Sequence, residues 1–166
     1  ISDLNCMIIF NPDSDKAISF GLHDEVFARD KVPITKSEVR AVILSKLNIS
    51  SDSICYDIGA GSGSVSIEMA GLAYEGKVYA VEKNPVAVEL IKKNIHNFNA
   101  ENIELIFAKA PKGLEHILEA DRIFIGGSGG ELNAVMDIIF ASQKHPTVVI
   151  SAITLETVAQ ISDILK

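Results

Sequence analysis

Five short apolar runs that alternate with helical patterns decide what this chain can fold into. Each run is nearly continuous in Val, Ile, Phe and Tyr, which is typical of strands buried on both faces of a parallel sheet. The runs lie at residues 54–59, 77–82, 103–108, 122–127 and 147–152, with helical patterns at 64–73, 84–98, 111–118 and 131–140. The alternation predicts an α/β fold: a doubly wound, mostly parallel, Rossmann-like sheet with helices on both faces.

The two ends of the chain extend this unit differently. A helical pattern at residues 36–47 precedes the first run, and another at 154–166 follows the last. Residues 4–10, "LNCMIIF", indicate a strand, and the polar stretch after them indicates a linker. We therefore divide the chain into residues 1–20, an N-terminal strand and linker, and residues 21–166, the α/β domain.

Composition narrows the function classes. The chain has 166 residues, 48% of them hydrophobic, and a formal net charge of −7, so nucleic acid is an unfavourable partner. No apolar run is long enough to cross a bilayer, and Cys6 and Cys55, each within an apolar run, fit unpaired thiols of a reducing compartment. The four histidines do not stand at metal-ligand spacing. We expect a soluble, cytoplasmic protein without a metal site.

The segment "DIGAGSGS", residues 57–64, is the clearest candidate for a ligand site. Gly59, Gly61 and Gly63 lie between the first run and its helix, where glycine lets a ligand approach the backbone and the helix N-terminus attracts an anionic group. The third glycine comes one position earlier than in the dinucleotide fingerprint G-x-G-x-x-G, and no lysine follows as in a phosphate-binding P-loop. The turn is therefore predicted to bind a small ligand with an anionic end. The alternative is a tight turn with a purely structural role.

Glu82 indicates what kind of ligand this is. It ends the second predicted strand, and in a doubly wound sheet an acid at that place faces the ligand crevice. A carboxylate there can accept hydrogen bonds from both hydroxyls of a ribose. The glycine turn and Glu82 together predict a nucleoside that carries an anionic appendage.

The motif "DIGAGSG", followed by an acid at the end of the next strand, resembles the class I S-adenosylmethionine-dependent methyltransferases over residues 54–152. A narrower resemblance begins at Gly21 and rests on six motifs in order. They are "GLHDEVF", "VPITKSEVRAVILSKL", "DIGAGSGSVSIEMA", "AKAPKGL", "FIGGSGGEL" and "AITLET". Together they resemble the decarboxylating precorrin methyltransferases of cobalamin biosynthesis.

This resemblance implies S-adenosylmethionine as the cofactor and a precorrin or cobalt-precorrin as the small-molecule substrate. The family methylates carbon 15 of the substrate and removes carbon dioxide from the acetate side chain at carbon 12. The resemblance also implies a homo-oligomer, a tetramer, and a fusion behind a second precorrin methyltransferase domain, of which residues 1–20 would be the tail. The family continues with a closing pair of strands, so C-terminal strands are expected to be missing here, and it commonly has asparagine where this chain has Ser151.

The resemblance also assigns cofactor contacts around the glycine turn. They comprise Thr35 before the first helix, Asp57, Gly59, Ala60, Gly61, Ser62 and Gly63 in the turn, Glu82, and Ala110 after the third strand. Some of these have a structural alternative. Thr35 can be a helix cap, Asp57 an acid that orders the turn, and Ala110 an ordinary loop residue.

The loop after the fourth strand is the candidate for substrate contact. It consists of Gly126, Gly127, Ser128, Gly129 and Gly130. Either its N–H groups bind a carboxylate, or the segment is simply a flexible loop. Lys36, Arg40 and Lys109 are the cations expected near it. Residues 24–27 form either a lid or a solvated surface loop.

Two other function classes stay open from the sequence alone. One is a methyltransferase that acts on RNA or protein, and the other is a non-catalytic nucleoside-binding domain. An enzyme that methylates amino groups would carry Asn-Pro-Pro or Asp-Pro-Pro where this chain has residues 126–130. We find no catalytic triad or dyad, which fits a transfer in which the sulfonium carries its own leaving group and the protein mainly orients the reactants.

Overall fold

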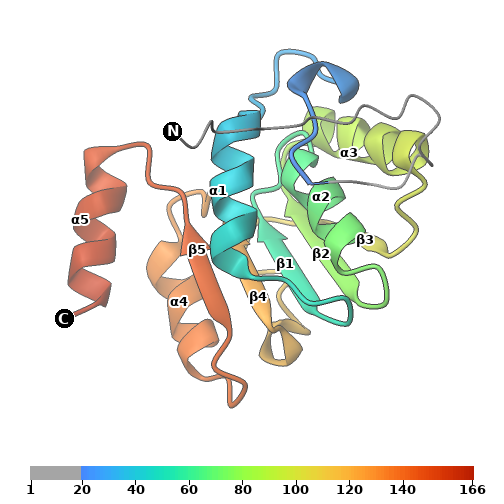
Figure 1. Cartoon of the computed structure of the whole chain (residues 1–166). Coiled ribbons are helices and arrows are strands. Elements are labelled where there is room, and N and C mark those ends of the chain that lie inside the picture. Colours follow the sequence, from blue (N-terminus) through green and yellow to red (C-terminus); the bar gives the residue numbers. More distant parts are fainter. Residues whose placement is uncertain (1–19) are drawn as a thin grey trace, which may run out of the picture.

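The structure of the protein, a computed structural model that describes residues 20–166, has at its centre a five-stranded sheet in the order β3-β2-β1-β4-β5 (Figure 1). The strands are β1 (Ile54–Ile58), β2 (Lys77–Glu82), β3 (Ile103–Phe107), β4 (Arg122–Ile125) and β5 (Thr147–Ile150). Every neighbouring pair is parallel, which confirms the predicted parallel α/β fold. The strand predicted at residues 4–10 lies outside the described residues.

Helices alternate with these strands. They are α1 (Ser37–Leu47), α2 (Ser64–Leu72), α3 (Pro85–Phe98), α4 (Leu132–Phe140) and α5 (Leu155–Ile164), with short 3-10 helices at Asp24–Val26 and Ile117–Glu119. Helix α3 begins as its sequence predicts, because the Asn84 side chain accepts a hydrogen bond from the N–H of Val86 at 2.9 Å. The helix predicted at 111–118 is wrong. Gly113 adopts a φ of +86°, which a right-handed helix cannot continue, and only the 3-10 helix follows.

The two faces of the sheet carry separate apolar cores. Cys55 of β1 and Val78 of β2 belong to the core that α1, α2 and α3 cover. The next residues along the same strands, Tyr56 and Tyr79, belong to the core that α4 covers on the opposite face. Because both faces are buried, neighbouring residues of a strand are both apolar, and this explains the continuous runs in the sequence.

A buried ion-pair network fixes the segment that precedes α1. The side chain of Arg40 in α1 is fully buried, and its guanidinium donates to Glu68 of α2 at 2.7 Å and to Asp24 at 2.8 Å. Asp24 and Phe27 are buried as well, and the guanidinium lies over the Phe27 ring, 4.8 Å from its centre. Asp24 and Phe27 therefore anchor residues 24–27 to the core, whereas Glu25 and Val26 between them are exposed. The expectation that Arg40 faces a substrate is wrong, because the network occupies it.

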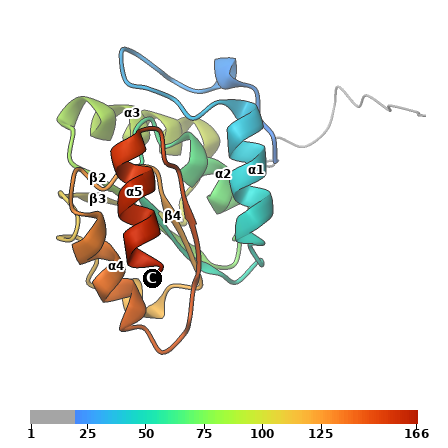
Figure 2. The same cartoon turned by 90° about the vertical axis from the view of Figure 1, so that its left-hand side faces the viewer.

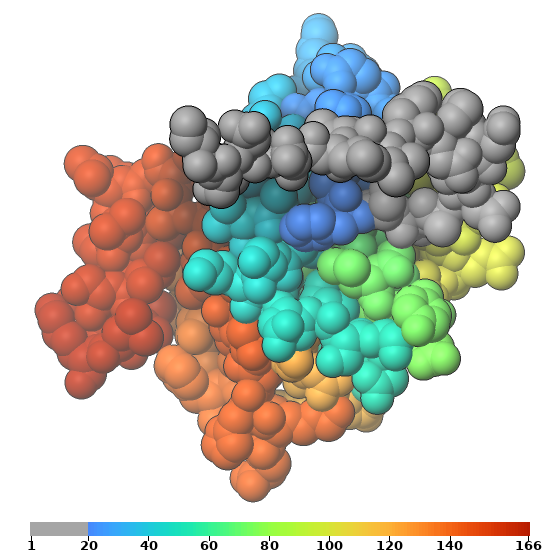
Figure 3. Space-filling view, viewed as in Figure 1, coloured from blue at the N-terminus to red at the C-terminus, as the bar shows by residue number. Residues whose placement is uncertain are grey.

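Helix α5 lies beside β5 and α4 at one side of the molecule (Figures 1 and 2). None of its residues is buried, and in the space-filling view it forms a lobe at the left-hand side (Figure 3). Its apolar residues Ile161 and Ile164 rest against the core that α4 covers, whereas Leu155 is 85% exposed. Among the described residues, no helix combines the length and the apolar character that crossing a membrane requires.

Candidate functional site

The strand order reverses between β1 and β4, and the loops that follow these two strands meet. The N–H groups of Gly126 and Gly127 both donate to the carbonyl oxygen of Ile58, at 2.9 and 3.2 Å. A Cβ on Gly59 would lie 2.4 Å from the carbonyl oxygen of Gly127, so only glycine permits this approach. In doubly wound sheets the crevice at such a reversal, outside the carboxyl ends of the strands, is the usual place of a ligand.

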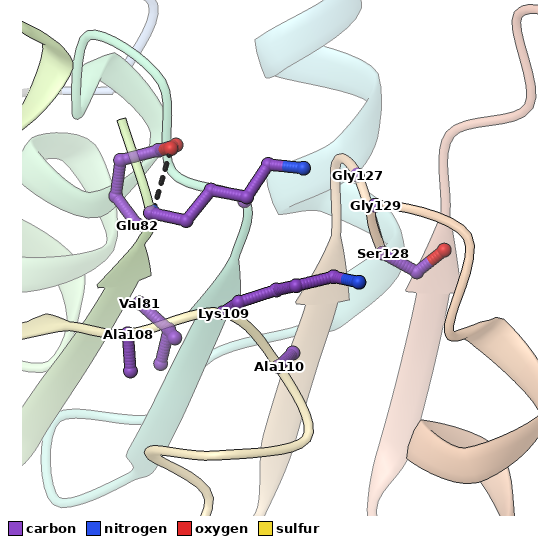
Figure 4. Close-up of a pocket in the computed structure, with 10 residues that line it drawn as sticks. Val81, Glu82, Ala108, Lys109, Ala110, Gly127, Ser128 and Gly129 are labelled. Atoms are coloured by element: carbon purple, nitrogen blue, oxygen red, sulfur yellow. Dashed lines mark hydrogen bonds between the residues drawn. The ribbon is translucent and has the colours of Figure 1, made fainter. Parts of the chain in front are cut away.

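A first cavity, of about 280 Å³, opens at this place (Figure 4). It is lined by Gly59, Val81, Glu82, Lys83, Ala108, Lys109, Ala110, Gly127, Ser128 and Gly129. These residues lie at or just beyond the carboxyl ends of β1, β2, β3 and β4. The structure thus brings together residues that the sequence predicted for cofactor and for substrate, namely Gly59, Glu82, Ala110, Gly127, Ser128 and Gly129.

Two further cavities adjoin the first. A second one, of about 400 Å³, shares Gly59 with it and is lined by the turn residues Ala60 and Gly61 and by Thr35 before α1. A third, of about 220 Å³, is lined by all of residues 126–130. Ser151 lines both of these, so its difference from the asparagine that is common in the resembling family falls within the hollow.

The carboxylate of Glu82 is fixed by the backbone around it. Its Oε2 accepts a hydrogen bond from the N–H of Gly61 at 2.9 Å, and its Oε1 accepts from the N–H groups of Lys83 and Asn84, both at 2.8 Å. The first bond ties the glycine turn to the end of β2. Since a carboxylate offers about four acceptor positions, roughly one remains, on Oε2. The ribose contact stays a prediction, and this geometry leaves room for one hydroxyl rather than two.

Asp57 lies beneath the glycine turn and lines none of these cavities. Its Oδ2 accepts a hydrogen bond from the Ser66 hydroxyl, and its Oδ1 has no partner among the described residues. Burial raises the pKa of Asp57 to about 7, the bond from Ser66 opposes this rise, and the negative charge of Glu82 adds to it. Ser62 and Gly63 are also buried and do not line the cavities.

Replacing Asp57 with asparagine is expected to remove a pH dependence of stability. The carboxyl ionises near a pKa of 3.8 in the unfolded chain but near 7 in the folded protein, so stability is lost as the pH rises between these values. Asparagine does not ionise. In urea titrations, the stability of Asp57→Asn relative to the unchanged protein should increase from about pH 4.5 to about pH 8. An equal stability difference at both pH values would contradict the raised pKa.

The loop at residues 126–130 offers fewer free donors than the sequence suggested. The N–H groups of Gly126 and Gly127 are engaged with Ile58. The other three N–H groups of the loop, those of Ser128, Gly129 and Gly130, have no acceptor within residues 20–166. A Cβ on Gly127 would meet no atom within 4 Å, and its φ is not positive. The fold therefore does not require glycine at position 127. Because Gly127 lines two cavities and has open space beside it, a ligand can approach its backbone closely.

One polar side chain that holds the site together has no marker in its local sequence. Asn94 of α3 is fully buried; its Nδ2 donates to the carbonyl oxygens of Ser62 and Ala28, at 2.9 and 3.1 Å, and its Oδ1 accepts from the N–H of Ala28 at 2.7 Å. It links the glycine turn to the segment before α1. The one hint in the sequence is a polar residue that stands among the apolar positions of an amphipathic helix.

Two lysines extend toward the loop at residues 126–130. Figure 4 shows the Lys109 side chain reaching toward Ser128, and its Nζ pairs with Glu131 at 2.8 Å. A Cβ on Gly129 would lie 2.8 Å from the Nζ of Lys83 and 3.6 Å from the Cε of Lys109. Both lysines thus converge on this loop. Lys36 lines the second cavity, and its Nζ forms an ion pair with Asp24 at 3.1 Å.

Comparison with known proteins relates this chain to one family. Residues 25–166 match the model of the precorrin methyltransferase domain family. A Sulfurisphaera tokodaii protein, named a probable cobalt-precorrin-6B C(15)-methyltransferase (decarboxylating), is 43% identical in an alignment of 146 residues, and the match covers 83% of this chain and 73% of that protein.

Solved structures give the same result. The precorrin-6y C5,15-methyltransferase from Geobacter metallireducens is 44% identical, with a TM-score of 0.83 over 88% of this chain and 78% of that one. A precorrin 8W decarboxylase from Methanobacterium thermoautotrophicum is 31% identical, with a TM-score of 0.80 over 87% and 78%. The glycine turn, Glu82 and the loop at residues 126–130 all lie within the matched domain. This chain belongs to the precorrin methyltransferase family.

Proposed function

We propose that this chain is an S-adenosylmethionine-dependent C-methyltransferase that methylates and decarboxylates a precorrin. The main support is that the glycine turn, Glu82 and the loop at residues 126–130 converge on adjoining cavities at one end of the sheet, in a chain of this family. The name of the relatives, cobalt-precorrin-6B C(15)-methyltransferase (decarboxylating), supports both the substrate and the two changes made to it.

The two cavities that meet at Gly59 suit the two parts of the cofactor. In the first cavity, Glu82 would accept a hydrogen bond from a ribose hydroxyl, and the backbone at Ala110 would border the adenine. In the second, the glycine turn and Thr35 would hold the methionine part beside the N-terminus of α2, whose partial positive charge favours a carboxylate. The cofactor would supply a methyl group on a positively charged sulfonium sulfur, which departs as a neutral thioether.

The chain itself has to align a nucleophilic carbon with that methyl group and exclude water. A reduced tetrapyrrole is electron-rich, so no strong base is needed. Methyl transfer leaves the macrocycle with one additional positive charge. Loss of carbon dioxide from an acetate side chain then returns the electron pair of the broken carbon–carbon bond to the macrocycle. Charge and electrons balance without an oxidant or reductant, which agrees with a site built from glycines and backbone groups.

The direct test is to mix the protein with cobalt-precorrin-6B and S-adenosylmethionine that is labelled in its methyl group. The corrinoid should acquire the label and lose one carboxylate, as measured by mass spectrometry. RNA and protein acceptors should remain unlabelled. Label in RNA or protein would contradict the proposed substrate, and an unlabelled corrinoid despite tight cofactor binding would indicate a ligand-binding domain.

Replacing Glu82 with glutamine is expected to weaken the binding of S-adenosylhomocysteine by about 1.5 kcal/mol, roughly tenfold, because a hydroxyl loses a charged acceptor. Glutamine keeps the size of the side chain and one oxygen for the N–H groups of Lys83 and Asn84, while its amide nitrogen replaces the oxygen that accepts from Gly61. Calorimetric titration measures the change, and Glu101→Gln, at an exposed acid outside the cavities, is the matched control. Unchanged affinity in a folded Glu82→Gln variant would remove Glu82 from the cofactor site.

A further inference from the structure

Lys83 and Lys109 bring two positive charges to the first cavity, and one of them, Lys109, is held in an ion pair. Lys109 pairs with Glu131 at 2.8 Å, and both side chains are nearly half exposed. Lys83 forms no ion pair within the described part of the chain. The adjacent carboxylate of Glu82 is engaged with backbone N–H groups. In a chain with a net charge of −7, two ammonium groups therefore lie at one cavity, and the ammonium of Lys83 is paired with no carboxylate within the described residues.

Backbone donors lie at the same place. Within residues 20–166, the N–H groups of Ser128, Gly129 and Gly130 have no acceptor, and the two lysine side chains converge on Gly129. Ser128 and Gly129 line the first cavity together with both lysines. Ammonium groups combined with free N–H groups at a glycine-rich loop make a binding site for an anion.

We propose that Lys83, Lys109 and the N–H groups of residues 128–130 bind a carboxylate of the substrate, and that the product retains this carboxylate. The proposal rests on the proposed function. The nucleoside part of the cofactor, to which the first cavity is assigned, is uncharged, so these lysines serve another molecule. A precorrin carries several acetate and propionate side chains and so supplies carboxylates.

The carboxylate that leaves as carbon dioxide must be a different one. An ion pair with ammonium groups stabilises a carboxylate, whereas carbon dioxide has no charge. Such a pair on the departing group would be stronger in the ground state than in the transition state and would slow its loss. The lysines therefore contribute to binding of the macrocycle and do not act on the departing carboxylate.

Glu131 acts in this site as an internal competitor. It holds Lys109 through an exposed ion pair, which is weak, and a substrate carboxylate that reaches Lys109 has to displace it. Substitutions at Lys83 and Glu131 should consequently change substrate binding in opposite directions.

Lys83→Met removes the charge and keeps an unbranched apolar side chain. With cobalt-precorrin-6B, KM should rise about tenfold, the effect of a lost charged hydrogen bond. The kcat, the ratio of carbon dioxide released to methyl transferred, and the Kd for S-adenosylhomocysteine should stay within about twofold. Lys93→Met, at an exposed lysine of α3, makes the same change in net charge and should leave KM unaltered.

Glu131→Gln should lower KM by about two- to fivefold, because an exposed ion pair no longer competes for Lys109. The side chain of Glu131 does not cap α4, so the variant loses no helix cap. Glu101→Gln is the matched control, since it removes one exposed negative charge away from the cavity. A purely structural role of Glu131 would not produce tighter substrate binding.

An unchanged KM in Lys83→Met would overturn the site. A loss of S-adenosylhomocysteine affinity that equals the rise in KM would also overturn it, by assigning Lys83 to the cofactor. A changed ratio of carbon dioxide released to methyl transferred in Lys83→Met would contradict the proposal, because it would show that the lysine acts on the departing carboxylate. If the unchanged protein transfers no methyl group to cobalt-precorrin-6B, the proposed function itself has failed and the carboxylate site with it.

Discussion

Replacing Arg40 with methionine is expected to lower the free energy of unfolding by about 3–5 kcal/mol, because removing one partner of a buried ion pair leaves an uncompensated buried charge. That charge is the carboxylate of Glu68, whose side chain is fully buried and accepts one further bond, from the N–H of Gly21. Asp24 would keep Lys36 as a partner. Urea denaturation followed by circular dichroism measures the loss.

Two further variants identify the cause of the loss. Arg29→Met removes an exposed arginine of the same segment and should change stability by no more than about 0.5 kcal/mol. The double variant Arg40→Met with Glu68→Gln neutralises the stranded carboxylate and should recover part of the stability. A loss below about 1 kcal/mol in Arg40→Met alone would contradict the structural role of the network.

The fold was predictable because its signals are local. A strand that is buried on both faces must be apolar at successive positions, and the central strands β1, β2 and β4 are buried and apolar over most of their length. The start of α3 is likewise predicted by two adjacent residues, Asn84 and Pro85. A helix was wrongly predicted at 111–118 because the apolar residues there repeat at helical spacing. Gly113 adopts a positive φ, which its neighbours in sequence do not reveal.

The site was only partly predictable, because its contacts join residues that are distant in sequence. The motifs located the glycine turn, Glu82 and the loop at residues 126–130, since each follows the end of a strand. They did not reveal that Glu82 binds the N–H of Gly61, or that Arg40 points into the core. A pattern of charges shows that a cation is present, whereas its partner and its burial depend on the packing of other elements.

The glycines of the loop at residues 126–130 show the same limit. Gly129 adopts a φ of +61° and faces Lys83, so alanine would be strained there, whereas Gly127 has neither constraint. The sequence does not distinguish the two positions. The structure identifies Gly127 as the one where a methyl group can be added to the cavity without disturbing the fold.

Gly127→Ala tests most directly whether methyl donor and precorrin meet at this loop. Apart from the neighbouring residues in the chain, no protein atom lies within 4 Å of the added Cβ, so thermal stability should be nearly unchanged. The affinity for S-adenosylhomocysteine should fall much less than turnover. Methyl transfer to cobalt-precorrin-6B and carbon dioxide release should both fall, by about 100-fold, because a displacement of about 1 Å at a reacting centre has an effect of that size. Stability, affinity and turnover are to be measured on the same preparation. Full turnover in the folded variant would contradict the proposed meeting place of methyl donor and substrate.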